Sequence, residues 1–522
     1  MYKKNNKSSA CADGEKSDGQ RGQEQYVNPQ SYKLDMNLKS NISHLQEIFA
    51  DSNDVHIREF LITHLNIRAA LVFVEGMADQ NIINEHILEK LTLPPVSGFA
   101  GSGREDNVLQ YLQDTLLTVA SVTEAGKFED VVKRVLSGDT ALFIDGIMAV
   151  LVAATRKVES RAVSEPESEK EIRGPRDGFT EELRVNITLL RRRLINPNLV
   201  VKKFIIGVRS STDVAVVYFR GIVDPELVNE VEKRLQDLKI DTTVIGIQGL
   251  LEDHPYSPFP TMLATERPDK FVAALADGKV GIVVDGTPFC LVVPTTLSDF
   301  FQAGDDYSEK WLSAAIIRFT RYVAAFLTLM MPALYIAIVS FHPAFLPTPL
   351  TLTLAEAREG IPFPAVVESL LMISMLEIMY EANIRIPKAI GPAVSIVGGL
   401  VLGDAAVRAG LVSPAMVIVT SITAISSFNI VNYRIILSLR LLRIPLMAIA
   451  TIFGMYGVIM GLLAIVTHLS ILESFGEPYL APFVPKNCAN LKDLKDTVFV
   501  APPASMKQRP AYLEPQDKKR QK

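Results

Sequence analysis

The chain has 522 residues, of which 48% are hydrophobic and 21% charged, and its formal net charge is -5 at pH 7. This length exceeds one ordinary domain, and the net charge gives no reason to expect nucleic-acid binding. Three widely separated cysteines, Cys11, Cys290 and Cys488, argue against a disulfide framework and fit a reducing compartment.

The first region, 1–33, is predicted to be a disordered tail. Its residues Met1–Gln30 are polar, with no apolar core that would make them a secretory signal. They also offer too little apolar surface to fold alone. We therefore expect the domain that follows to remain in the cytoplasm.

Next come two stretches that resemble each other. Leu71–Gly76 is followed by Asp79, and Val216–Gly221 by Asp224, so each reads as an apolar strand, a glycine turn and an aspartate N-cap. In both cases an amphipathic helix is predicted after the aspartate.

A second pair of matching stretches lies further along. Ala141–Gly146 and Gly281–Gly286 are apolar strands that end in Asp-Gly, a strong hairpin signal. The helices Phe128–Leu136 and Asp269–Ala276 are predicted just before them. The repetition predicts two related α/β subdomains, whose expected bounds are 34–157 and 198–307.

The linker between the subdomains, 158–197, is rich in charge. Glycine and proline disfavour regular structure up to Gly178, and a helix is predicted through Leu183, Ile187 and Leu190 to the arginines at 191–193. The linker is either a solvated connector or an ordered hinge whose arginines contact acidic partners or lipid phosphates. The candidate coupling residues are Arg173, Arg176, Arg191 and Arg192.

A transmembrane domain is predicted over 308–472. Ser308–Arg321 is amphipathic, with Trp311 and Tyr322 placed as interfacial aromatic anchors. Tyr322–Phe341 then carries no charge, and twenty helical residues rise about 30 Å, one hydrocarbon thickness.

The apolar stretch Ile361–Tyr380 carries two glutamates, Glu368 and Glu377. A carboxylate that faces lipid costs on the order of 2.5–3.5 kcal/mol, so both side chains should face other helices or water. Either they pack inside the bundle, with Glu381 paired to Arg385 nearby, or one of them lines an ion path.

The next apolar stretch, Ile390–Asn432, is interrupted by glycines and by Asp404 and Arg408. It is either two spans that meet at a polar turn or a discontinuous helix pair. Ala415–Phe428 and Ile444–Thr467 are further apolar runs, which brings the count to four or five membrane segments. A solvated cytoplasmic tail is expected over 473–522.

Motifs for catalysis or cofactor binding are weak or absent. Gly98–Glu105 has the glycine spacing of a phosphate-binding loop but lacks its lysine. The seven histidines have no metal-ligand spacing, and no Gly-x-Ser-x-Gly sequence occurs. We expect no cofactor, no metal site and no enzymatic activity.

Several short strings occur together in one order along the chain. They are Arg173–Arg176, Arg191–Arg193, Tyr256–Pro260, Glu266–Asp269, Val339–His342, Pro362–Pro364, Leu402–Ala406, Gly410–Pro414 and Ala424–Phe428. With these strings the chain resembles the A subunit of the GerA family of spore germination receptors, over roughly Leu34–Phe483.

This resemblance implies a multi-pass protein of the spore inner membrane with its N-terminal domain in the cytoplasm. It implies partnership with a nutrient-binding B subunit and a lipoprotein C subunit, contact with membrane lipid, and no nucleic acid. It also implies a homo-oligomeric ring, with a pentamer as the candidate, that forms a nutrient-gated cation channel.

The candidate pore-lining residues on this interpretation are Glu368, Glu377, Val394, Val397, Gly398, Val401 and Asp404. Two alternatives remain open. One is a germination-accessory paralogue without its own nutrient partner, and the other is a secondary transporter with a regulatory cytosolic domain.

Overall fold

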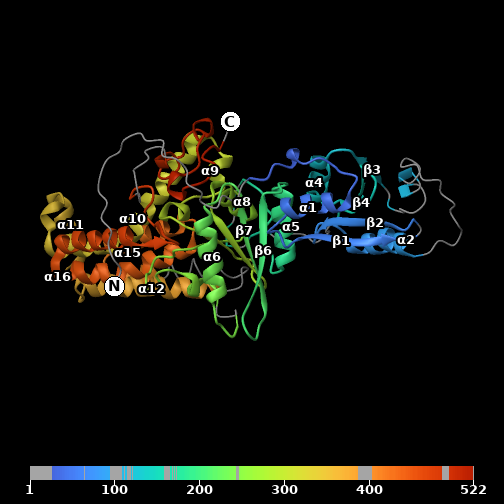
Figure 1. Cartoon of the computed structure of the whole chain (residues 1–522). Coiled ribbons are helices and arrows are strands. Elements are labelled where there is room, and N and C mark those ends of the chain that lie inside the picture. The colour runs from blue at the N-terminus through green and yellow to red at the C-terminus, as the bar shows by residue number, and fades with distance from the viewer. Residues whose placement is uncertain are drawn as a thin grey trace, which may run out of the picture.

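The computed structural model of the chain arranges three parts in a row (Figure 1), with the first α/β subdomain at one end, the second in the middle and a helical bundle at the other end. The structure describes residues 26–63, 65–93, 109–110, 112–113, 119, 121–157, 165–166, 168–169, 171, 173–242, 246–385, 402–484 and 493–520.

The first subdomain is a five-stranded antiparallel sheet in the order β1-β2-β4-β5-β3. Helices α1 and α4 cover one face of this sheet, and η2 and α2 cover the other. Its elements are η1 (Pro29–Ser31), α1 (Leu38–Ile48), β1 (Val55–Ile62), β2 (Ile67–Val74), η2 (Ile82–Leu88), α2 (Glu89–Thr92), β3 (Val122–Ala125), α4 (Phe128–Leu136), β4 (Thr140–Ile144) and β5 (Val150–Ala153).

The second subdomain repeats this arrangement, with the strand order β6-β7-β9-β10-β8. Here α5 and α8 pack on one face of the sheet and α6 and α7 on the other. Its elements are α5 (Leu183–Arg193), β6 (Leu199–Ile206), β7 (Thr212–Phe219), α6 (Pro225–Asp237), α7 (Gln248–Leu251), β8 (Leu263–Thr265), α8 (Pro268–Asp277), β9 (Val280–Val284), β10 (Cys290–Val293), η5 (Leu297–Phe300) and α9 (Asp305–Ser308).

The aspartates of the two Asp-Gly hairpins make equivalent hydrogen bonds in the two subdomains. Asp145 accepts a hydrogen bond from the N–H of Leu38 at 3.0 Å, and Asp285 accepts one from the N–H of Leu183 at 2.9 Å. Each aspartate thus binds a free N–H at the start of a helix, a position that favours a carboxylate. The predicted relatedness of the subdomains is confirmed in strand order and in this contact.

One expectation about the linker needs correction. The helix at its end was assigned to a connector over 158–197, but α5 occupies in the second subdomain the place that α1 has in the first. The reason is that its apolar face, with Leu183, Ile187 and Leu190, is buried against the second sheet.

The bundle is built around α10, which packs on α12, α15 and α16. By length and composition, α10 and α16 are the two described helices that could cross a membrane. The elements are α10 (Trp311–Phe341), η6 (Pro343–Phe345), α11 (Thr348–Arg358), α12 (Ala365–Arg385), α14 (Leu402–Arg408), α15 (Pro414–Phe428), α16 (Tyr433–Ile471), β11 (Glu473–Ser474), β12 (Glu477–Pro478), η8 (Asp493–Lys495), η9 (Pro503–Ser505) and η10 (Ala511–Leu513).

Helix α16 reverses direction at Gly454, where φ is 58° and ψ is -137°. Thirty straight helical residues would extend about 45 Å, yet Ser438 and His468 both bind the loop at 257–258 of the second subdomain. A Cβ atom on Gly461 would lie 2.5 Å from Leu446 Cδ1, so the two arms touch. The arms, 433–453 and 455–471, rise about 31 Å and 25 Å, which suits a helical hairpin across a bilayer.

The turn at Gly454 lies at the end of α10 that is remote from the soluble region. A Cβ atom there would meet Phe341 and His342 at 3.0 Å. Both arms of α16 therefore end on the side of the second subdomain, and the chain leaves the bundle on the side where it entered.

Candidate functional site: the junction between the soluble region and the bundle

Four charged side chains meet where the second subdomain joins α10. Asp306 accepts hydrogen bonds at 2.9 Å from Arg318 Nε and at 2.9 Å from Arg321. Arg318 also donates to Asp496 of the C-terminal segment at 2.7 Å. We call Asp306, Arg318, Arg321 and Asp496 the junction cluster. It joins α9 and α10, which are neighbours in sequence, to the C-terminal segment 178 positions away from Arg318.

Burial makes the junction cluster strong and dependent on each member. Arg318 is 0% exposed and Asp306 3%. Buried ions lose their hydration and are tolerated only when paired and hydrogen-bonded. Removing one partner from the buried pair of Arg318 and Asp306 costs about 3–5 kcal/mol, whereas Asp496, which links the C-terminal segment, is 26% exposed.

The C-terminal segment does not behave as the solvated tail that we expected. Leu297 donates its N–H to the carbonyl of Tyr479 at 2.8 Å, and Arg509 donates to the carbonyl of Ala276 at 2.7 Å. Tyr479 is buried among the core residues shared by the second subdomain and the bundle. The described residues after 472 therefore belong to the folded structure, because they are hydrogen-bonded to the second subdomain and Tyr479 is part of its apolar core.

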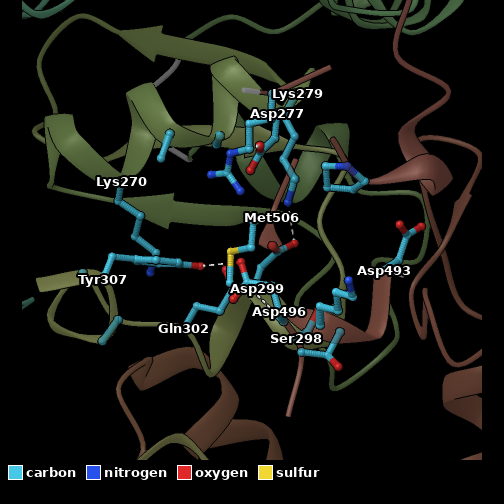
Figure 2. A pocket seen from close by; sticks show the side chains of 18 of the residues that line it. Lys270, Asp277, Lys279, Ser298, Asp299, Gln302, Tyr307, Asp493, Asp496 and Met506 are labelled. Atoms are coloured by element: carbon cyan, nitrogen blue, oxygen red, sulfur yellow. Dashed lines mark hydrogen bonds and ion pairs between the residues drawn. The ribbon is translucent and has the colours of Figure 1, made fainter. Parts of the chain in front are cut away.

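A cavity of about 720 Å³ remains between this segment and the second subdomain. Figure 2 shows its walls, with Tyr307 directed at Asp496 and Lys279 at Asp299. Two ion pairs lie in its wall, because Lys279 is 2.6 Å from Asp299 and Arg520 is 3.5 Å from Asp277. Burial raises the pKa of Asp277, and the positive charge of Arg520 opposes this shift by stabilising the ionised carboxylate.

The linker contacts the second subdomain mainly through its glutamates. Glu171 pairs with the buried Arg267 at 2.6 Å, and Glu169 pairs with Lys270 at 3.1 Å. The pKa of Glu171 is raised to about 7 by burial, which outweighs the opposing effect of Arg267. Glu169 and Glu171 therefore help to hold the described linker residues on the second subdomain.

The four predicted coupling arginines have different environments. Arg191 is fully buried and binds both oxygens of Asp54 at 2.8 Å, across the interface between the two subdomains. Arg192 is exposed and donates to the carbonyl of Lys157 at 3.3 Å. Arg173 is exposed, and its N–H binds Asp305, next to the junction cluster, at 3.0 Å. Arg176 is exposed.

Glu368, a predicted pore-lining residue, is 0% exposed in the bundle. Its carboxylate accepts hydrogen bonds from the N–H and the hydroxyl of Ser413, the N-cap of α15. Arg358 lies 3.9 Å away. A carboxylate at a helix N-terminus is stabilised by the free N–H groups and the helix dipole.

Glu377 faces two arginines of α16. It forms an ion pair with Arg440 and lies 3.9 Å from Arg443. Arg440 also lies over the ring of Tyr380, 4.6 Å from its centre. Both glutamates therefore point to protein groups, as the insertion cost predicts. Their role as pore lining stays a prediction.

The remaining predicted pore residues are divided by what the structure describes. Asp404 is exposed and pairs with Arg408 at 2.8 Å, as the spacing predicts. Val394, Val397, Gly398 and Val401 lie outside the described residues, as does the loop Gly98–Glu105.

Sequence reasoning missed the junction cluster. One signal was present, because Arg318 and Arg321 are three positions apart on the face of α10 that lies opposite its apolar side chains. Their partners could not be found in this way, since Asp496 is 178 positions from Arg318.

Comparison with known proteins finds one family that matches most of the chain. The sequence model described as Bacillus/Clostridium GerA spore germination protein matches residues 43–512. The chain is 38% identical to spore germination protein GerLA of Bacillus cereus, over 93% of this chain and 97% of that protein. It is 37% identical to spore germination protein B1 of Bacillus subtilis strain 168, over 94% of this chain and 100% of that protein.

Among solved structures, the N-terminal domain of the A subunit of the Bacillus megaterium spore germinant receptor GerK3 is similar at 31% identity, with a TM-score of 0.40, over 50% of this chain and 96% of that chain. The family model and both of these relatives match the chain over most of its length. The chain therefore belongs to the Bacillus/Clostridium GerA family of spore germination proteins.

Proposed function

We propose that this chain is the A subunit of a nutrient germinant receptor in the spore inner membrane. Copies of it assemble into a ring, with a pentamer as the candidate, that conducts cations when nutrient acts on the receptor. The B and C subunits and membrane lipid are its partners, and we assign it no catalytic role.

The observation that supports this proposal most is the junction cluster. Arg318 is an early residue of α10, yet it is paired with Asp306 of the second subdomain and with Asp496 of the C-terminal segment. The apolar core is also continuous, since Phe271 of the subdomain and Leu329 of α10 belong to one cluster of buried residues. A displacement of the soluble region must therefore move α10, as a receptor that opens a channel requires.

The pore assignment in this proposal rests on the segment from Val394 to Asp404. Glu368 and Glu377 hold the bundle together within one copy through Ser413 and Arg440. The proposed lining of the passage consists of the candidate residues of this segment together with Glu368 and Glu377, because a small residue such as Gly398 lets a backbone line a narrow passage.

The test is cation flux from liposomes that contain the full chain, with and without the B and C subunits, before and after nutrient is added. We expect flux only with nutrient and partners. In Asp496→Asn, the weakened pair with Arg318 should lower nutrient-triggered flux while assembly with the partners persists. Lys310→Met, an exposed change beside the same helix, is the matched control.

Unchanged flux in Asp496→Asn would remove the junction cluster from the proposal. Flux without any partner subunit would favour the accessory paralogue, and flux that requires a counter-transported solute would favour the secondary transporter.

A further inference from the structure

The first turns of α10 have two opposite faces. Arg318 and Arg321 lie on one face, buried against the second subdomain and the C-terminal segment. The other face is apolar but exposed. Its residues recur every three or four positions and are Leu312 (57% exposed), Ile316 (58%), Phe319 (46%), Val323 (40%) and Phe326 (48%).

This apolar stripe continues the surface of the membrane-spanning part of α10 without a break. The helix has 31 residues and rises about 46 Å, against about 30 Å for the hydrocarbon layer and 40–45 Å with both headgroup regions. Its first turns therefore extend through the headgroup region on the side of the soluble domains. Trp311, 48% exposed, stands at the start of the helix, where tryptophan favours the interface.

The C-terminal segment adds an aromatic side chain to the same surface. Residues 495–501 form a closed turn, in which Ala501 donates its N–H to the carbonyl of Lys495 at 2.9 Å and Asp496 pairs with Val500. Phe499 projects from this turn, 56% exposed, and stacks on Phe319 with ring centres 5.7 Å apart.

A groove beside the stripe has the same character. It has a volume of about 480 Å³, lies between α10 and α15, and includes Val323 of the stripe. Its other wall carries Ile425 and Phe428, which are 69% and 66% exposed. Exposed apolar surface of this extent marks an interaction site, and its continuity with the spanning helix indicates lipid.

We propose that Trp311, Leu312, Ile316, Phe319 and Phe499 form an interfacial patch that inserts into the headgroup region of the bilayer. The C-terminal segment is thereby held between the membrane surface and the junction cluster. This inference does not require channel activity.

The chain has one tryptophan, so Trp311 is a built-in reporter of the patch. The full chain is reconstituted in phosphatidylcholine vesicles that contain lipids brominated either near the headgroup or near the chain end. We expect blue-shifted emission, stronger quenching by the headgroup-proximal bromines, and little quenching by iodide.

The second reporter moves the tryptophan to the C-terminal segment. In the double variant Trp311→Phe/Phe499→Trp, headgroup-proximal bromines should quench the emission as they do in the parent chain. The matched control is Trp311→Phe/Phe289→Trp, on the β9–β10 hairpin, which iodide should quench and bromines should not.

Two results would overturn the proposal. Strong iodide quenching at both patch positions would place the patch in water. Blue-shifted emission that neither quencher reduces would show that protein, such as a second copy of the chain, covers the patch. Because each position has its own reporter, a variant that fails to fold leaves the parent measurement on Trp311 decisive.

Discussion

Arg191 and Arg192 are neighbours in sequence with opposite environments. The first is 0% exposed and binds both carboxylate oxygens of Asp54, whereas the second lies on the surface. Sequence alone grouped them as one basic run at the end of a helix. It could not separate them, because the difference arises from a loop of the other subdomain, 137 positions away.

The substitution Arg191→Met should lower the free energy of unfolding by about 3–5 kcal/mol, because it leaves Asp54 buried without its partner. Arg192→Met should change it by less than about 0.5 kcal/mol, as expected for a surface site. Denaturant unfolding of the full chain in detergent, followed by Trp311 fluorescence, measures both. Equal effects of the two changes would contradict the interface that we describe.

Glu368 gives a second prediction at this scale. Glu368→Gln keeps an oxygen that can accept the hydrogen bonds of Ser413, so the unfolding midpoint should change little. Glu368→Leu leaves the buried N–H of Ser413 unpaired, while the Ser413 hydroxyl keeps its hydrogen bond with Tyr335. An unpaired buried donor costs about 1–3 kcal/mol. If glutamine destabilised the bundle as much as leucine, the negative charge itself would be the stabilising feature.

At the scale of elements, the sequence predicted several helices and strands closely. The helix Phe128–Leu136 was predicted residue for residue, and the strands around the Asp-Gly hairpins were also found. The edge strands β1 and β6 were missed, since polar side chains such as His56, Arg58 and Lys203 interrupt their apolar pattern.

The reversal inside α16 was also missed, because hydropathy stays high on both sides of Gly454. The predicted span Ile444–Thr467 runs across this turn and is wrong as one straight segment. The structure shows the turn through the backbone at Gly454, whose φ and ψ lie in a region that side chains disfavour, and through the contact between the two arms at Gly461 and Leu446.

The substitution Gly454→Ala should destabilise the protein by on the order of 1–3 kcal/mol, because the residue must keep a strained backbone and its Cβ meets Phe341 and His342 at 3.0 Å. Gly360→Ala is the matched control, as no described atom lies within 4 Å of its Cβ. Unfolding midpoints in detergent compare the two. A stable Gly454→Ala protein would argue for a continuous helix.

At the scale of the whole molecule, composition predicts that the soluble region precedes the helical bundle. It does not predict the contacts by which the soluble region, the linker and the bundle are joined. The linker, the start of α8 and α9 meet around Glu171. Its charged neighbours are Arg267 at the N-cap of α8, Asp269 of α8 and Asp305 of α9. Contacts of this kind depend on the folded chain, so no sequence pattern predicts them.

Because the pKa of Glu171 is raised from 4.5 to about 7, the folded chain retains a proton that the unfolded chain releases. Its stability should therefore fall as pH rises through this window. In Glu171→Gln this part of the pH dependence should disappear, while the exposed control Glu181→Gln should keep it. Unfolding midpoints of the full chain between about pH 5 and pH 8 provide the measurement. Parallel profiles for Glu171→Gln and the parent would show that Glu171 does not titrate there.

The turn at Gly454 also determines which compartments the two ends of the polypeptide can reach. Since both arms of α16 end beside the second subdomain, we expect the two ends of the described chain, near Tyr26 and Arg520, to share one compartment. Among the described residues, α11 and the Gly454 turn follow or touch the end of α10 that is remote from the soluble region, so an antibody or protease added from the opposite side should meet them. Tags fused at either terminus should therefore become accessible together when the membrane is permeabilised.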